Sequence, residues 1–413
     1  MTPTAQTTGF AQFPPQLTAL AQALTEVSTG EDGEISYESL PPFYLPAEQG
    51  RQLQKLVDDL YGPLKYSTRY AWDELLNMFD QWIIEERNGA AKKTLEERFA
   101  ALRADFQAPC PKQIVVMPVY GLELKLDKLS IGHVQFVKYG DTAYRKRWAD
   151  DMAAHPRLEL QEVFLPLDDD VTCLHYETHA TQERAAQLAQ QAALGVLNVL
   201  RYTVSRSQFA DQHVQFDLFS GENRKRFRRF LVVNEHGTKA LEHGHYAGPD
   251  ESLVLDAAWY ASAQAVGLDD ISTFLKQDQL TPMQTVLFAA VYWFGNYQAQ
   301  SSLDNQLLSL ATSIEAGLGT RAQDNITVKL AEGLAVLLGQ DREERIRIRE
   351  DFKKLYKLRS GVSHGSQAKV TSADVGRFDG YARRLIHVLI QSTARFKSHE
   401  ELRQHIDDCK MSF

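Results

Sequence analysis

The C-terminal part of the chain, from about residue 252 onward, carries apolar residues at helical spacing and shows no alternating strand pattern. A helix signal sustained over so many residues restricts this part of the chain to packed helices, and we predict an antiparallel helical bundle. The last helix starts at a capping-box-like segment, Thr371 to Asp374. We expect helices over roughly 252–278 (broken at Gly267), 282–299, 301–318, 325–338, 342–360 and 373–396.

The preceding region has a different texture. Between residues 113 and 177, short alternating runs such as Leu122 to Leu126 and Val134 to Val137 are interrupted by glycines, which predicts a mostly antiparallel sheet. Thr181 opens a long Ala/Leu-rich helical segment to about Val204, and strand-like pieces follow at 214–219 and 230–234. These elements predict an α+β middle domain.

Four parts follow from these patterns, and the fold class they predict is α+β multidomain. Residues 1–50 form an irregular lead segment rich in Pro, Gly and Thr, and 51–110 have helical spacing. Residues 111–265 form an α+β sensor or regulatory domain, and 266–413 form the all-α bundle. The chain is thus expected to have a helical and α+β N-terminal region followed by a helical bundle.

Composition narrows the class of protein. The 413 residues include 45 Lys+Arg against 54 Asp+Glu, a net charge of -9, which argues against a surface that coats nucleic acid without sequence preference. Two local basic clusters, 145–148 and 224–229, are either phosphate contacts or ordinary solvated surface. The longest apolar stretch, Val286 to Phe294, is too short to cross a bilayer, and no signal layout opens the chain. We expect a cytoplasmic protein without membrane contact, and the three cysteines fit reduced thiols.

Metal and cofactor motifs give weak signals. Cys173, His175 and Glu177 would share one face of a strand, but a fourth ligand is lacking. His236, His243 and His245 are spread through a Gly-containing connection and are equally weak. Phosphate-binding loops, dinucleotide fingerprints, zincin motifs and serine-hydrolase motifs do not occur in the sequence. We therefore predict neither a metal nor a cofactor.

The most informative stretch is Asp351 to Gly365, DFKKLYKLRSGVSHG. Arg359 falls four residues after Leu355 on the apolar stripe of a predicted helix, where burial of an unpaired guanidinium costs several kcal/mol. It therefore needs a carboxylate, a helix C-terminal carbonyl or an anionic ligand. His364 follows just past the helix end, so a cation with five donors stands near a group that titrates close to neutral pH. A multi-donor cation and a group of this pKa are what phosphoryl chemistry on RNA requires.

This run resembles the R-x4-6-H signature of the HEPN superfamily, and its context is similar to the Apea-like HEPN branch. The likeness covers about 280–396 and is carried by the segments 303–318, 329–339 and 355–365. The resemblance implies a small helical bundle that dimerises and acts as a metal-independent endoribonuclease, commonly in prokaryotic toxin or anti-phage defence systems. It implies an RNA substrate, a homodimer, and a phage-derived trigger or a regulatory protein as a further partner.

The chemistry expected of the site needs few groups, because RNA supplies its own nucleophile, the 2′-hydroxyl. His364 would act as base or acid, Arg359 would hold the phosphate, and a two-fold dimer would bring two such pairs into one cleft. Glu315 stands where this branch usually has an acidic residue; it either orients the pair or forms a plain ion pair. Residues expected to contact RNA are Lys354, Tyr356, Lys357 and Ser360.

Alternatives remain for several of these residues. Tyr356 either stacks on a base or packs in the core, and Ser363 either takes part in the site or only caps the turn. In the plain structural alternative, the helix ends at Gly361 and Arg359 satisfies terminal carbonyls. The alternative function is a non-catalytic HEPN-like module for RNA binding or dimerisation. Ser366 also departs from the tyrosine of HEPN toxins that nucleotidyltransferase antitoxins modify.

Overall fold

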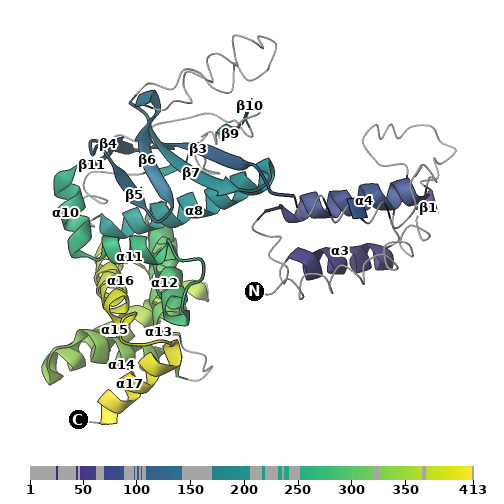
Figure 1. Ribbon diagram of the computed structural model, residues 1–413. Coiled ribbons are helices and arrows are strands. Elements are labelled where there is room, and N and C mark those ends of the chain that lie inside the picture. Colours follow the sequence, from purple (N-terminus) through teal and green to yellow (C-terminus); the bar gives the residue numbers. More distant parts are fainter. Residues whose placement is uncertain are drawn as a thin grey trace. The chain divides into compact units, whose positions relative to one another are not determined.

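The described part of the protein falls into two compact units (Figure 1). The first unit takes residues 1–114 and 177–188, and the second takes 115–176 and 189–413. The four-part division of the sequence stays a prediction. The computed structural model describes residues 25–26, 43–44, 47–61, 69–87, 97, 100–101, 104, 108–141, 170–204, 216–218, 231–234, 237–240, 252–300, 302–319, 325–364 and 369–411.

The first unit contains two paired helices, α3 (Ala47–Tyr61) and α4 (Trp72–Arg87). The apolar spacing of α4 places Leu75, Phe79 and Ile83 on one buried face, as the helical period predicts. Two-residue strands β1 (Thr25–Glu26) and β2 (Phe43–Tyr44) pair antiparallel in the same unit. The helical prediction for this part of the chain is thus confirmed over α3 and α4, while both basic clusters lie outside the described residues.

A sheet of seven described strands occupies the middle of the chain, in the order β10-β9-β3-β7-β6-β5 with β8 beside β3. The β5-β6, β6-β7, β3-β8 and β9-β10 pairs are antiparallel, which confirms the largely antiparallel sheet expected from the alternating pattern. The strands are β3 (Lys112–Tyr120), β5 (Leu129–Ile131), β6 (Val134–Lys138), β7 (Thr172–His179), β8 (Asp217–Leu218), β9 (Leu231–Asn234) and β10 (Gly237–Ala240).

A parallel strand pair corrects one expectation. Residues 253–255, predicted to be helical, form strand β11 (Leu253–Leu255), which pairs parallel with β4 (Leu122–Leu124). The partner strand lies far away in the sequence, so local spacing around residue 253 carries no trace of it. The helix expected over 252–278 begins only after this strand, as α10 (Ala257–Ala265), and breaks at Gly267 before α11 (Leu268–Phe274), as predicted.

Helix α8 (Gln182–Thr203) lies between the sheet and the helices in Figure 1, and its second half belongs to the second unit. Val196, Leu197 and Leu200 give it a buried side. Its C-terminal end packs on the bundle, because Tyr202 meets the Phe294 ring edge-on at 5.9 Å. Helix α11 also contacts the sheet, because the Gly132 amide of the β5-β6 turn donates to Ser272 Oγ at 3.0 Å.

The remaining helices pack around a core that includes Phe294, Phe352 and Phe378. Helix α15 is three residues longer than predicted, and α17 was not predicted as a separate helix. Among the described residues, every helix is too short or too polar to pass through a bilayer. The described chain is thus mostly helical with a small sheet, as an α+β multidomain protein. The helices are α12 (Pro282–Ala299), α13 (Leu303–Leu318), α14 (Ile326–Leu338), α15 (Arg342–Ser363), α16 (Ser372–Ser392) and α17 (His399–Met411).

Candidate functional site

The C-terminal end of α15 carries the residues singled out by the sequence. The helix starts at Asp341, whose side chain accepts from the Glu344 amide, and its apolar stripe buries Ile348, Phe352 and Leu355. It does not stop at Gly361 but runs to Ser363, and the His364 amide donates to the carbonyl oxygens of Ser360 and Gly361. His364 is therefore the first residue beyond the end of the helix.

Arg359 lies on the buried stripe and has a carboxylate partner on another helix. Its Nε atom is 3.1 Å from Glu315 Oε1 of α13, at ion-pair distance but without hydrogen-bond geometry. Its Nη2 donates to Glu315 Oε2 at 3.5 Å, and its Nη1 donates to Ser363 Oγ at 3.3 Å. The two charged side chains are only 28% and 20% exposed, so this pairing offsets the cost of partial burial.

Tyr356 completes this group from one turn earlier on α15. Its hydroxyl donates to Glu315 Oε1 at 2.7 Å, and the Arg359 guanidinium lies 5.6 Å from the centre of its ring. Burial, and then the hydrogen bond to Glu315, raise the pKa of the Tyr356 hydroxyl above its usual value. The ring is 4% exposed and lies 5.7 Å from that of Phe352, so it packs in the core. Its contact with RNA stays a prediction.

The other predicted site residues face solvent to different degrees. Lys354, Lys357 and His364 are exposed, and Ser360 is half-buried. The His364 imidazole has no hydrogen-bond partner among the described residues, so it is available to a ligand. The sequence left open whether Ser363 takes part in the site or only caps the turn, and the structure shows that its hydroxyl accepts from Arg359. The spacing of four residues between them on one helix was the available signal.

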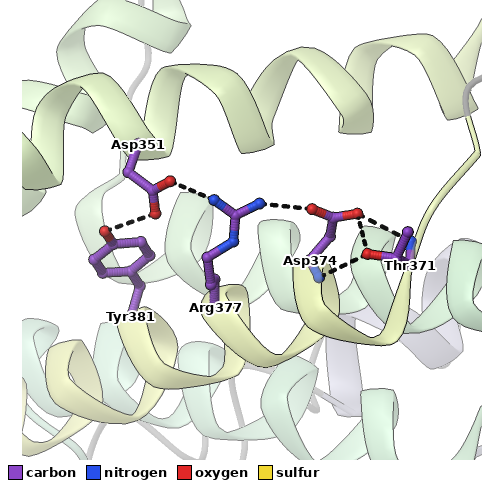
Figure 2. Close-up of polar contacts among 5 residues, drawn as sticks. All are labelled: Asp351, Thr371, Asp374, Arg377 and Tyr381. Carbon is purple, nitrogen blue, oxygen red and sulfur yellow. Dashed lines mark hydrogen bonds and ion pairs between the residues drawn. The ribbon is translucent and has the colours of Figure 1, made fainter.

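A polar network ties α16 to an earlier turn of α15, at Asp351 (Figure 2). Arg377 of α16 bridges two carboxylates, donating to Asp351 at 2.5 Å and to Asp374 at 2.7 Å. Tyr381 donates to the second oxygen of Asp351 at 3.0 Å, and burial is the main reason that its pKa rises to about 12. Asp374 also closes the predicted capping box with Thr371, which is therefore confirmed.

The described part of the chain contains no group of three or more His, Cys, Asp or Glu side chains placed to hold a metal ion. Cys173 and His175 lie in β7; the thiol is fully buried, which raises its pKa, and the imidazole bonds Gln135 at 3.2 Å. Glu177 pairs with Lys112 at 2.6 Å. The histidines at 236, 243 and 245 lie outside the described residues.

This geometry defines what the site offers chemically. An arginine is held in place by a carboxylate, a hydroxyl and an aromatic ring, and a histidine stands free in solvent five residues later. The pair supplies a fixed cation for a phosphate oxygen and an imidazole that a substrate can reach. Comparisons of the chain with protein-family models, with curated proteins and with solved structures found no match.

Proposed function

We propose that the protein is a metal-independent endoribonuclease whose site is built on Arg359 and His364 in a HEPN-like helical bundle. The single observation that supports this is that one helix end carries both a guanidinium fixed by Glu315 and, five residues later, a solvent-exposed imidazole. Fixed orientation matters because a catalytic cation must be in place before charge develops on the phosphate. A free imidazole matters because proton transfer requires direct access to the substrate.

In this proposal His364 takes the proton of the 2′-hydroxyl or donates a proton to the leaving 5′-oxygen, a role typically worth about 10² to 10⁴-fold in rate. Arg359 holds the phosphate and stabilises its added negative charge, with Glu315 and Tyr356 positioning the guanidinium. Lys354 and Lys357 are exposed on the same helix and contact the RNA backbone. Ser360, half-buried beside Arg359, lines the RNA path.

Two copies of the chain form the working site in this proposal. In-line displacement needs a base and an acid on opposite sides of the phosphorus, and one motif supplies one histidine. An isologous dimer duplicates both Arg359 and His364 about one axis. A cytoplasmic effector in prokaryotic anti-phage defence or a toxin system, released by a phage-derived trigger or a regulatory protein, is the setting that the HEPN resemblance suggests.

One observation favours a second function, a non-catalytic RNA-binding or dimerisation module. The charge of Arg359 is already balanced by Glu315, and this carboxylate repels an incoming phosphate. In this alternative the ion pair is a structural tie between α13 and α15, and RNA contacts only the exposed lysines.

A cleavage assay separates the two functions. Purified full-length protein is incubated with total RNA in excess EDTA, alongside Arg359→Ala and His364→Ala. We expect cleavage that persists with chelator, leaves 2′,3′-cyclic phosphate ends, and falls by at least about 10²-fold in each variant. Arg349→Ala, a half-buried arginine of the same helix, and His133→Ala, an exposed histidine of the β5-β6 turn, are the matched controls and keep full activity.

The assay also has clear contrary outcomes. Cleavage that both site variants retain would remove Arg359 and His364 from the reaction. RNA binding without cleavage, weakened by Lys354→Ala and Lys357→Ala, would support the binding module instead. Loss of cleavage with EDTA would contradict the metal-independent mechanism.

A further inference from the structure

A cavity of about 620 Å³ lies in the second unit where α8, α10, α14 and α16 meet. Its volume is within the roughly 300 to 1,000 Å³ that small-molecule sites occupy. Its lining residues are distinct from Arg359, His364 and Glu315. Nothing in the proposed ribonuclease reaction uses this space, so its lining calls for a separate explanation.

One part of the lining is apolar. Val266 follows α10, Leu337 and Leu338 end α14, and Val388 belongs to α16. The Tyr202 hydroxyl, also in the lining, is occupied because it donates to the Val266 carbonyl at 3.0 Å. This part of the cavity suits the hydrocarbon portion of a ligand.

The one carboxylate of the lining is already engaged. Asp379 accepts from the Tyr297 hydroxyl at 2.6 Å and from Arg383 Nε at 2.9 Å. The hydroxyl protons are also committed, because Thr203 donates to a carbonyl of α8 and Ser262 to one of α10. A ligand that offers donors would therefore find no free carboxylate in the lining, only hydroxyl oxygens.

Donor groups, in contrast, remain unused on α16. Arg383 donates through Nη1 to the Tyr202 carbonyl at 2.6 Å, yet its Nη2 is buried and has no partner among the described residues. His387, one turn later on the same face, has Nε2 3.0 Å from the Gln391 amide nitrogen. Because an amide nitrogen only donates, Nε2 accepts from it, which leaves Nδ1 as the donor of the ring; this atom is also buried without a partner in the described part of the chain.

These two unpaired donors need an acceptor, since buried polar groups without partners are rare in folded proteins. Arg384 adds a second guanidinium to the lining, and it pairs with Glu344 outside the cavity at 3.1 Å. Each arginine thus has a carboxylate partner, and the donors left without one among the described residues are the Arg383 Nη2 and the His387 Nδ1. These donors favour an anion, because charge-assisted hydrogen bonds are about twice as strong as neutral ones.

We propose that this cavity binds a small molecule with an anionic head group, a phosphate or a carboxylate, on an apolar body. The head group contacts Arg383 and His387, and the body lies against Val266, Leu338 and Val388. The site joins α8, which packs under the sheet, to α16, which is tied to α15 by Arg377. This inference goes beyond the proposed ribonuclease and does not rest on it.

Isothermal titration of the full-length protein tests the proposal with four probes. Hexyl phosphate and hexanoate carry the two head groups on one apolar body, 1-hexanol lacks the charge, and inorganic phosphate lacks the body. We expect one-site binding of at least one of the anionic alkyl probes, at least tenfold tighter than 1-hexanol and than inorganic phosphate. The stronger of the two identifies the head group.

Two variants locate the site. His387→Leu removes one unpaired donor and should weaken the anionic probe about tenfold, as expected for a hydrogen bond to a charged group. Ser262→Trp fills the cavity from an exposed position of α10 and should abolish binding, whereas Ala261→Trp, at the preceding and also exposed position, should not. Arg383 is left unchanged because it also holds Asp379 and Tyr202.

The outcomes are decisive in both directions. No saturable binding of either anionic probe at millimolar concentration would overturn the proposal, as would equal affinity for 1-hexanol. Unchanged affinity in Ser262→Trp would place the binding elsewhere. Because binding is measured without RNA, failure of the ribonuclease assay has no bearing on this result.

Discussion

Arg359 shows how one side chain links stability to function. A guanidinium on an apolar helix stripe is tolerated because Glu315 lies across from it on α13, and Tyr356 supplies both a donor for the carboxylate and a ring face for the cation. The sequence predicts that Arg359 needs a partner, since the cost of burying a charge is general. Local spacing does not identify the carboxylate, because the contact joins residues 44 positions apart and depends on how α13 and α15 pack. Glu315 was singled out only through the HEPN resemblance.

We predict that Glu315→Gln lowers the free energy of unfolding by about 1 kcal/mol, because a neutral amide cannot offset the partly buried guanidinium of Arg359. Urea denaturation measures this. Glu350→Gln alters a carboxylate of α15 that pairs with Arg349 and Lys353 in solvent, and it should leave stability unchanged. Equal effects of both substitutions on the free energy of unfolding would show that the Glu315–Arg359 pair stabilises the fold no more than a surface pair.

At the scale of elements, local pattern predicted those with strong internal signals. Helices α12 to α16 were placed within a few residues because each has a dense apolar stripe, and α12 and α16 also begin with capping boxes. Helix α17 was missed because, among its described residues, the buried apolar side chains are only Leu402 and Ile406. Strand β11 was missed because its stability comes from pairing with β4, which local spacing does not report.

The junction between α13 and α17 predicts a pH dependence. Gly319 ends α13 in a left-handed conformation, and a side chain there would overlap the buried imidazole of His399. Burial, and secondly the charge of Arg403, lower the pKa of His399, against the opposing effect of Glu400. The folded state therefore favours the neutral ring.

The sign of the effect follows from proton linkage. Below about pH 6.5, the ordinary value for histidine, the unfolded chain binds a proton that the folded chain resists, so stability is complete above this pH and is lost as pH falls. We expect the difference in unfolding free energy between about pH 7.5 and about pH 5.5 to shrink in His399→Gln. The exposed His133→Gln should leave that difference as in the wild type. A wild type as stable at the lower pH would contradict this.

At the scale of the whole molecule, the second unit joins sheet and helices in one packed body. The Gly132 turn of the sheet bonds α11, and Tyr202 at the end of α8 contacts both Phe294 and Arg383. The candidate ligand cavity lies at this junction, and the Arg377 network leads from α16 to the helix that carries Arg359. Helix α16 thus carries both part of the cavity lining and the ion pair to the helix of Arg359.

The proposed reaction also requires two chains, and this gives the last prediction. If each scissile phosphate needs His364 from both copies, specific activity must fall when the protein is diluted through the concentration at which dimers dissociate. Ribonuclease assays and sedimentation over one concentration series should give superimposable curves. Excess His364→Ala should then lower wild-type activity, because mixed dimers carry one imidazole, whereas excess His133→Ala should not. Full specific activity in a monomer would show that one copy of each residue suffices, and the shared-cleft mechanism would be wrong.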